Sequence, residues 1–516
     1  MSSSDQASPR GQTSGAGVPD AADQGIDKRV VLGVICLSSF LTAMMSSSVN
    51  IAIPSIGREF GADAITLSWV ATGFLLALGV VLVPLGKAAD IYGRKRVFLI
   101  GSVAWVVTSL LCGLATSVSA LIGFRALQGM ASAAFGGTSS AIVTSVYSPR
   151  ERGQALGIAV AAVYIGLSAG PFVGGVMTQQ LGWRSMFLLS AVLGALMVGV
   201  IIWKMRAEWA EARGQKLDLV GSGLFAAALL PVMYGFSVLP ALPGAGLIAA
   251  GLACLAIFVW WEDRVANPVL DIRLFRHNAV FAVSNLAALI NYAATFAIGF
   301  LLSLYLQYVK GLTPQTAGLI LLAQPVIMAV FSPITGRLSD RIEPRVVASA
   351  GMAITTVGLV MLAFLGDSSG LGYIVGALVV AGFGFALFSS PNTNAIMGSV
   401  ERSVLGVASA TLSVFRSVGQ MLSMGIATLI IAVYVGGVAI SPENHAAFSS
   451  AFRLSFIIFS ALCLVGIFAS LKRGDLHTPT ARAAASTSGS VPALGDPALR
   501  NPRRGGPARA ESEEGR

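Results

Sequence analysis

The chain has 516 residues, of which 55% are hydrophobic and only 11% are charged. No water-soluble fold of this size could bury so large an apolar fraction, so the composition excludes an ordinary soluble domain and indicates a protein in the lipid bilayer. The net charge of +10 does not indicate a nucleic-acid partner, because Lys and Arg are confined to short gaps between long apolar runs and no nucleic-acid motif accompanies them.

The two ends of the chain differ in composition from the rest. Residues 1–29 are rich in Ser, Gly and Asp and lack the apolar core and cleavage site of a signal peptide, which predicts a disordered cytoplasmic N-terminus. Residues 473–516 are rich in Ala, Pro, Gly, Ser and Arg, which predicts a disordered cytoplasmic tail without a catalytic role.

Apolar windows fill the region between residues 30 and 472. A helix needs about 20 largely apolar residues to cross the hydrocarbon core. Fourteen such windows occur, at residues 30–53, 67–88, 97–116, 120–143, 154–178, 185–204, 218–238, 245–262, 279–307, 313–335, 346–365, 371–390, 404–434 and 451–471. We therefore predict an all-α integral membrane protein, with a six-helix bundle in 30–204, two inserted transmembrane helices in 217–262 and a second six-helix bundle in 279–472.

The distribution of Lys and Arg among the predicted loops sets the topology. The loops assigned to one side of the membrane hold many more basic residues than the loops assigned to the other, where we find only Arg58, Arg184, Lys310 and Arg453. Because basic loops remain in the cytoplasm, we expect a multi-pass protein of the cell inner membrane with both termini cytoplasmic.

Catalytic and metal-binding patterns are missing from the sequence. The four cysteines each lie singly within an apolar run, and His277, His445 and His477 lie in predicted loops or in the tail. No phosphate-binding GxxxxGK[ST] loop occurs, which disfavours ATP hydrolysis. We expect no enzyme activity, no metal and no cofactor.

The loop between the second and third spans reads GKAADIYGRKR, from Gly86 to Arg96, and resembles the signature loop of the major facilitator superfamily. Gly86 and Gly93 allow close helix approach and a sharp turn. Asp90 is expected to cap or face a helix N-terminus, and Arg94 to reach a carboxylate or carbonyl. The resemblance implies a conformational latch on the cytoplasmic side; the alternative is a basic loop without a dynamic role.

A second copy of this loop, GRLSDRIEPR from Gly336 to Arg345, follows the tenth span. Its position corresponds to that of the first loop once the two extra helices are allowed for. The repeat indicates an internal duplication, with two parallel six-helix repeats and an inserted pair.

Two further motifs lie within the first six spans. RALQGM in the fourth span holds Arg125 and Gln128, where a membrane-embedded Arg needs partners; Arg125 either bonds backbone carbonyls or faces a cavity as a charge for coupling or substrate binding. GLSAGPFVGG in the fifth span resembles the antiporter motif of exporters, and its pivot residues are Gly166, Gly170, Pro171, Gly174 and Gly175. Small residues let helices touch closely, and Pro171 removes a backbone donor and bends the helix.

The resemblance extends along nearly all of residues 30–472 and, with fourteen spans, points to the fourteen-helix drug:proton antiporter family. It implies the major facilitator fold, multidrug efflux and a proton gradient as energy source. One position departs from the family pattern, because Met45 in MMSSSVNIAIP replaces the aspartate expected there. Methionine neither titrates nor attracts a cation by full charge.

No other carboxylate lies near the middle of a predicted span, and Arg125 and Arg416 are the only charges deep within spans. We therefore predict a central cavity that is neutral to positive and favours neutral or anionic amphiphiles. Its expected lining is Met44, Met45, Asn50, Phe74, Gln128, Tyr164, Asn291, Tyr292, Phe296, Gln324, Asn392 and Gln420, with Asn285 and Gln307 as further polar candidates. The alternative for each polar side chain is a structural bond between helices.

These features predict a secondary active exporter of small amphiphilic molecules that works by alternating access and is present as a monomer. Protons would use Asp90 with Arg125, a terminal acid such as Asp218, or a titratable group of the substrate. The alternatives are a dedicated exporter of a neutral or anionic endogenous metabolite or lipid, a membrane-embedded enzyme, and a receptor that no longer transports.

Overall fold

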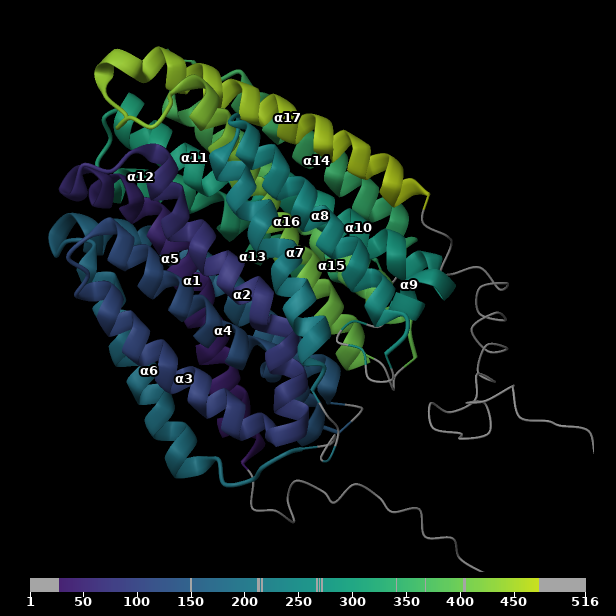
Figure 1. Cartoon of the computed structure of the whole chain (residues 1–516). Helices are drawn as coiled ribbons and strands as arrows, with labels where there is room; N and C mark the ends of the chain where they lie inside the picture. Colours follow the sequence, from purple (N-terminus) through teal and green to yellow (C-terminus); the bar gives the residue numbers. More distant parts are fainter. Residues whose placement is uncertain are drawn as a thin grey trace, which may run out of the picture. The chain divides into compact units, whose positions relative to one another are not determined.

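A computed structural model describes residues 27–148, 151–210, 214, 217–265, 268, 270, 272–339, 341–366, 368–401 and 405–472 (Figure 1). The disorder predicted for most of 1–29 and for 473–516 concerns residues outside this part of the chain. Fourteen helical segments of the described chain are long and apolar enough to cross a membrane. The predicted fourteen spans and the all-α fold class are confirmed.

The first eight spans are single helices. Six of them form what we call the first half: α1 (Lys28–Phe60), α2 (Ala64–Tyr92), α3 (Arg94–Gly113), α4 (Val118–Val146), α5 (Arg152–Gln180) and α6 (Arg184–Lys204). The next two, α7 (Leu219–Val238) and α8 (Leu242–Glu262), form the inserted pair. Polar side chains cap the first turns of several of these helices. At α2, for example, Asp63 accepts hydrogen bonds from the Ile65 and Thr66 amides.

The second half follows the short helix α9 (Ile272–His277). Its ninth and tenth spans are each built from shorter pieces: α10 (Ala279–Thr295), α11 (Ile298–Leu304) and the π-helical turn η2 (Tyr305–Val309), then α12 (Pro314–Leu321) and α13 (Ala323–Leu338). The last four spans are α14 (Pro344–Ala363), α15 (Leu371–Gly398), α16 (Leu405–Tyr434) and α17 (His445–Leu471), the last preceded by the turn η4 (Pro442–Asn444).

The sequence predicts the ninth and tenth spans as continuous helices, and the structure interrupts both. The ninth breaks at Phe296 and Ala297, where the Ala297 amide donates to the Ser423 hydroxyl of α16 at 3.0 Å. The tenth breaks at Leu322. A membrane-embedded helix tolerates such breaks because neighbouring helices satisfy the freed backbone groups.

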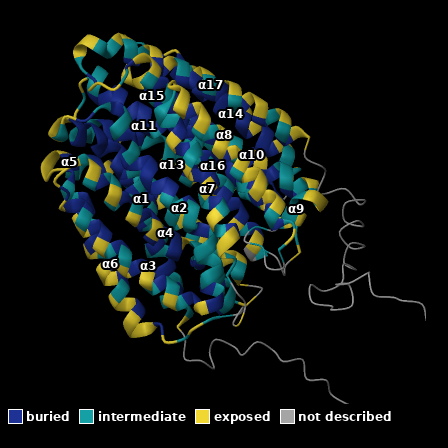
Figure 2. Ribbon diagram, in the orientation of Figure 1, coloured by how far each residue is buried: buried dark blue, intermediate teal, exposed yellow. Residues whose placement is uncertain are grey.

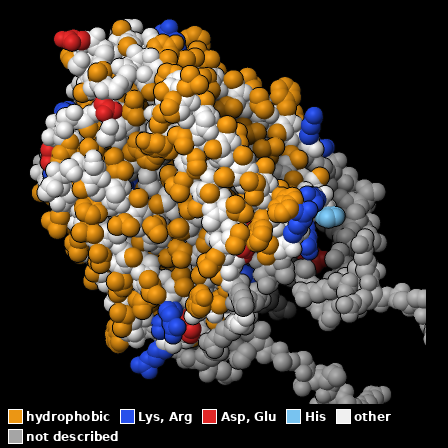
Figure 3. Space-filling model, in the orientation of Figure 1, with side chains coloured by type: hydrophobic (Ala, Val, Ile, Leu, Met, Phe, Trp, Pro, Cys, Tyr) orange, Lys and Arg blue, Asp and Glu red, His pale blue; other side chains and the backbone are white. Residues whose placement is uncertain are grey.

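Apolar side chains cover the flanks of the helices, while charged side chains lie mainly at the two ends (Figures 2 and 3). Large exposed apolar residues include Ile100 on α3, Val192 on α6 and Phe468 on α17. An apolar belt of this kind is the surface that lipid tails cover. We call the end with Lys28, Arg94 and Lys204 the basic face, and the end with Phe60, Ala64 and Arg184 the opposite face.

Close contacts at glycines join neighbouring helices in each half. A Cβ atom at Gly129 of α4 would lie 2.2 Å from the Phe74 carbonyl oxygen of α2. In the second half, a Cβ atom at Gly384 of α15 would lie 2.3 Å from the Thr355 amide of α14. At these positions no side chain fits without moving a backbone.

The inserted pair packs mainly on itself, and α7 also packs against α2 of the first half and α16 of the second half. Trp69 of α2 lies 6.1 Å from Tyr234 of α7, measured between ring centroids. Phe236 of α7 is in close contact with Gly425 of α16. The helix α7 therefore covers the seam between α2 and α16.

The contact at Gly129 makes a testable prediction. We expect Gly129→Ala to destabilise the protein by about 1–3 kcal/mol, because the added methyl group forces α2 and α4 apart. Gly123→Ala on the same helix is the matched control, since no atom lies within 4 Å of its Cβ position. Thermal unfolding of both purified variants checks this; equal melting temperatures would contradict the packing described.

Candidate functional site

The predicted latch joins α2 to α3 at the basic face. The Arg94 Nε atom donates to Asp90 Oδ1 at 2.8 Å, and Arg94 Nη1 donates to the Ser145 hydroxyl of α4 at 2.6 Å. Arg94 is buried, so its partners hold it in one position. The expectation that Arg94 reaches a carboxylate is confirmed.

A carboxylate from the segment that follows α6 caps α3. The Lys95 and Arg96 amides both donate to Glu208, and the Arg94 amide donates to the Trp209 carbonyl at 2.7 Å. The expectation that Asp90 caps or faces a helix N-terminus stays a prediction; in the structure Asp90 lies within the last turn of α2 and pairs with Arg94. The sequence analysis missed Glu208, one of two acids in residues 205–217, the loop that follows α6.

Gly93 explains why the cap has to come from elsewhere. Its φ of 118° makes the turn between α2 and α3, and a glycine has no side chain to bind the first amides of α3. A Cβ atom at Gly93 would lie 2.5 Å from Glu208 Oε1. Gly86, at the other end of the loop, has only an ordinary contact with Gly137 of α4. The latch therefore consists of the loop and the segment that follows α6.

The second copy of this loop is held in a related way. In the second copy, Asn394 of α15 donates to the Ser339 hydroxyl at 2.8 Å. In the first copy, a helix outside the loop also makes such a bond, where Ser145 of α4 accepts from Arg94. Asp340 lies outside the described residues.

An ion pair joins α1 to the start of α5 at the basic face, where Lys28 lies 3.2 Å from Glu151. Hydrogen bonds from Ser148 and from Lys28 hold the pKa of the Glu151 carboxyl below its usual range.

The antiporter-like motif packs on two helices. Gly166, Gly170 and Gly174 face α1, where a Cβ atom at Gly170 would lie 2.6 Å from the Met44 carbonyl oxygen. Gly175 instead faces α12 of the second half, with its Cβ position 2.7 Å from the Pro314 carbonyl oxygen. Gly318 of α12 approaches the Pro171 carbonyl oxygen in the same way. The motif thus lies at a junction between the two halves.

Hydrogen bonds join the two halves near the opposite face. The Gln307 amide donates to the Ile51 carbonyl at 2.9 Å, and the Tyr308 hydroxyl donates to the Pro54 carbonyl at 3.1 Å. Two more pairs join the halves at this face: Thr428 with Ser68, and Gln315 with Gln179. Gln307 and Tyr308 lie on the π-helical turn η2, which turns both toward α1. The opposite-face ends of the halves are therefore held together.

Arg125 is fully buried between α2, α3 and α4. Its Nε atom donates to the Val70 carbonyl at 3.1 Å, its guanidinium lies 4.2 Å from the Phe74 ring centroid, and a further bond runs to Gln128. Gln128 in turn donates to the Ser109 hydroxyl of α3 at 2.7 Å. The sequence left open whether Arg125 bonds backbone carbonyls or faces a cavity. In the structure Arg125 bonds a backbone carbonyl.

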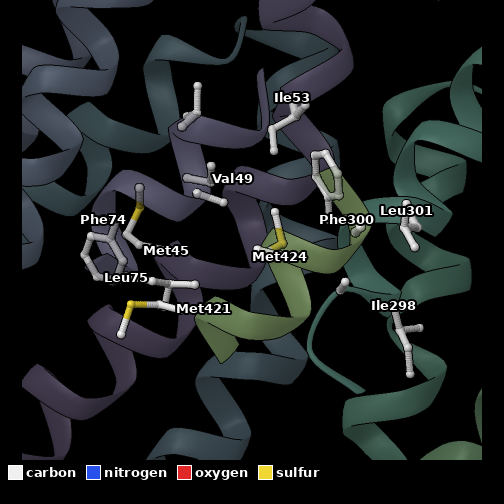
Figure 4. Packing of buried hydrophobic residues seen from close by; sticks show 14 of the residues in the cluster. Met45, Val49, Ile53, Phe74, Leu75, Ile298, Phe300, Leu301, Met421 and Met424 are labelled. Atoms are coloured by element: carbon white, nitrogen blue, oxygen red, sulfur yellow. The ribbon is translucent and has the colours of Figure 1, made fainter. Parts of the chain in front are cut away.

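Met45 lies in a buried apolar cluster where the two halves meet. Figure 4 shows it beside Phe74 and Leu75 of α2, with Met421 and Met424 of α16 close by. Met45 is 0% exposed, and Met44 on the same helix is also buried. A carboxylate at position 45 would have no polar partner among these cluster members.

A second cluster lies deeper in the second half and reaches across to α5. The Arg416 guanidinium of α16 donates to the Thr393 hydroxyl of α15 at 2.9 Å and lies 5.6 Å from the Tyr292 ring centroid. The Tyr164 hydroxyl of α5 lies 3.3 Å from the Ser389 hydroxyl of α15. The structure thus brings together three predicted residues, Tyr164, Tyr292 and Arg416, from three helices.

The remaining polar candidates lie apart from one another. Asn392 donates to the Ser284 carbonyl within the second half at 3.2 Å, and Asn285 donates to the Phe281 carbonyl of its own helix. Asn291 is fully buried, and both polar atoms of its side chain lack a hydrogen-bond partner. The others are placed singly: Asn50 near Gly299 of α11, Phe296 at the break in the ninth span, Gln324 near Gly382 of α15 and Gln420 one turn beyond Arg416 on α16.

Asp218, the terminal acid considered for proton transfer, has a structural position. It caps α7 by accepting from the Gly221 amide at 2.8 Å and also accepts from the Trp261 indole at 3.0 Å. Among the described residues no group of three or more His, Cys, Asp or Glu side chains could hold a metal ion.

Fourteen spans, paired basic-face loops and a glycine junction between two halves define a secondary transporter of small molecules. The chain belongs to the Major Facilitator Superfamily, whose family model matches residues 35–261 and 285–505. It is therefore a multi-pass membrane transporter and not an enzyme, as the sequence predicted.

Curated relatives and solved structures agree with this family. The chain is 32% identical over 414 residues to the multidrug resistance protein Stp of Mycobacterium tuberculosis (strain CDC 1551 / Oshkosh), covering 79% of this chain and 76% of that protein. It is 28% identical to the riboflavin transporter RibZ of Clostridioides difficile (strain 630), covering 85% and 96%. A peptide transporter structure matches in fold alone, with a TM-score of 0.64, 14% identity and coverage of 86% and 97%.

The cap on α3 makes a testable prediction. We expect Glu208→Ala to destabilise the basic-face end of α3 by about 1 kcal/mol, because the Lys95 and Arg96 amides lose their acceptor. Hydrogen exchange at these two amides should then become roughly five times faster. The control is Glu443→Ala, which removes an exposed carboxylate at the opposite face. Unchanged exchange in Glu208→Ala would show that Glu208 does not cap the helix.

Proposed function

We propose that this protein is a secondary active exporter of small amphiphilic molecules that works by alternating access and is driven by the proton gradient. In this proposal the basic face is cytoplasmic, both termini lie there and the protein acts as a monomer in the inner membrane. The two six-helix bundles, residues 30–204 and 279–472, would rock against each other about a central substrate site.

The junction formed by Gly175 and Gly318 carries the proposal. At this junction α5 and α12 touch backbone to backbone, and one side chain, that of Gln179, also bonds across it to the Gln315 amide. Such a contact can open and close with little rearrangement of rotamers. The hydrogen bonds from η2 to α1 also lie near the opposite face. The structure thus corresponds to a state in which the two halves are closed at the opposite face. The similarity to the multidrug resistance protein Stp favours export.

Energy coupling has to differ from the pattern expected for the family. Met45 occupies the position of the expected aspartate and is packed in an apolar cluster. We propose that protons use the Asp90–Arg94 latch with Arg125, or a titratable group on the substrate. Asp218 is a weaker candidate because its carboxylate is already used as a helix cap.

The second candidate function is dedicated export of one endogenous metabolite or lipid, neutral or anionic. The apolar packing of Met45 favours it, because the middle of α1 offers no carboxylate to attract cationic drugs. The similarity to the riboflavin transporter RibZ is compatible with a single natural substrate. A deletion strain distinguishes the two functions. It should accumulate many different compounds if export is broad, and one compound if export is dedicated.

Transport in proteoliposomes tests the proposal. With purified protein and an imposed pH gradient, we expect at least one of a panel of neutral and anionic amphiphiles to move several times faster than in protein-free liposomes. An uncoupler should remove this difference. Flux that ignores both the gradient and the uncoupler would overturn proton coupling, and no flux for any compound would overturn export.

A variant at the glycine junction serves as the internal control of the same assay. Gly318→Ala would place a methyl group against the Pro171 carbonyl oxygen and should slow flux about tenfold or more without loss of expression. Gly157→Ala on α5, whose Cβ position is open, should transport like the natural protein. Equal flux in both variants would show that this junction does not move during transport.

Met45 offers a second test. We expect Met45→Asp to lower stability by about 3 kcal/mol, because a carboxylate within an apolar membrane cluster is costly. Met45→Leu conserves volume and should cost less than about 1.5 kcal/mol. In transport assays Met45→Asp should shift selectivity toward cationic compounds. Unchanged stability and selectivity would indicate that position 45 does not face the transport pathway.

A further inference from the structure

Two arginines lie deep in the membrane-spanning region, and their surroundings differ. Arg125 is enclosed by a backbone carbonyl, an amide oxygen and an aromatic ring. Arg416 is only partly buried, and its guanidinium has one hydrogen bond among the described residues, to Thr393. A guanidinium has five N–H donors, so most of the donors of Arg416 remain available.

Arg416 lies far from either end of its helix. It is 11 residues beyond Leu405, which corresponds to about 17 Å along α16. Its Nε atom is buried and has no hydrogen-bond partner, and no carboxylate of the described chain lies within 4.0 Å of it. A cation at this depth costs several kcal/mol unless a partner offsets it.

The side chains around Arg416 form a small amphipathic site. Its hydroxyl groups include Thr393, which accepts from Arg416, and Ser389 one turn away, 3.3 Å from the Tyr164 hydroxyl. Its aromatic rings include Tyr292, which packs edge-to-face on Phe385 with 5.3 Å between ring centroids. We call these six residues the Arg416 cluster.

The cluster also spans the two halves. Tyr164 belongs to α5 of the first half, whereas the other five residues belong to α10, α15 and α16 of the second half. Tyr164, Tyr292, Thr393 and Arg416 are all partly exposed although they lie at mid-depth and on faces that meet other helices. Their partial exposure shows that neighbouring side chains do not enclose them completely.

We propose that the Arg416 cluster binds the anionic group of an aromatic amphiphile. A carboxylate, sulfonate or phosphate would accept the free N–H donors of Arg416 in a charge-assisted pair, and its aromatic body would lie against Tyr292 and Phe385. The proposal rests on the proposed export function and specifies its substrate class. Because Tyr164 comes from the other half, a ligand held there would contact both moving parts.

Binding of three matched probes tests the proposal. The probes are 2-naphthoate, 2-naphthalenemethanol and 2-naphthylmethylammonium, which share one ring system and differ in charge. With the full-length protein in detergent micelles at neutral pH, we expect 2-naphthoate to bind at least tenfold more tightly than the other two. Equal affinities for all three, or a preference for the ammonium, would overturn the proposal without any variant.

Variants then locate the anion. Arg416→Gln should reduce 2-naphthoate affinity to that of the alcohol and leave alcohol binding unchanged, which also reports that the variant is folded. Arg416→Lys should retain part of the preference. The matched control is Arg453→Gln, which removes an exposed positive charge on α17 and should bind like the natural protein. An equal loss in Arg416→Gln and Arg453→Gln would place the anion elsewhere and overturn the assignment.

The source of the anion is tested by adding lipids to the micelles. Displacement of 2-naphthoate by phosphatidylglycerol but not by phosphatidylcholine would assign the anionic group to a lipid, and no displacement would assign it to a water-soluble compound. Flux assays with the same three probes separate the two proposals. Absence of any flux with intact 2-naphthoate preference overturns export alone, and flux without that preference overturns the anion site alone.

Discussion

Close backbone contact at glycines holds this protein together. Lipid tails are as apolar as the helix flanks, so burial of apolar side chains gives little drive for helices to associate within the bilayer. The most extensively packed pairs of helices accordingly meet at glycines: Gly170 and Gly174 between α5 and α1, Gly129 between α4 and α2, Gly351 and Gly384 between α14 and α15, and Gly235 and Gly251 between α7 and α8. Within each half these contacts fix the framework. Between the halves, Gly175 and Gly318 make the same kind of contact.

Polar groups within this framework fall into satisfied and unsatisfied sets. The first set includes Arg125 with Gln128, which ties three helices of the first half together, and Arg94 with Asp90 and Ser145. The second set includes Asn291 and the Nε atom of Arg416, both in the second half. Buried polar groups without partners are costly, and they occur in both halves, since Asn50, Thr72 and Thr178 of the first half also carry one. Arg416 differs from the others in being a cation, which makes its unbonded Nε atom the most costly of them.

The sequence was sufficient for those features that depend on local pattern. Span number follows from apolar length, and the latch and antiporter-like motifs follow from residues within about ten positions of each other. Features made by distant residues were not predicted. Glu208 caps α3 from more than 100 positions away, and Met421 and Met424 meet Met45 from across the chain. The break at Phe296 gave no signal, because neither Phe296 nor Ala297 is a glycine or proline. The break at Leu322 had a signal that the sequence analysis did not use: Pro325 cannot donate to the carbonyl of Leu321, the last residue of α12.

The position of α7 has a consequence for how the membrane reaches the transport pathway. Because α7 lies over the seam between α2 and α16, lipid tails are kept from that flank of the boundary between the halves. The other flank, where α5 meets α12 and α13, has no inserted helix packed extensively on it among the described segments. The surrounding bilayer therefore meets the two sides of the transporter unequally. The helix that contributes Tyr164, α5, lies on the flank that the inserted pair leaves to the lipid.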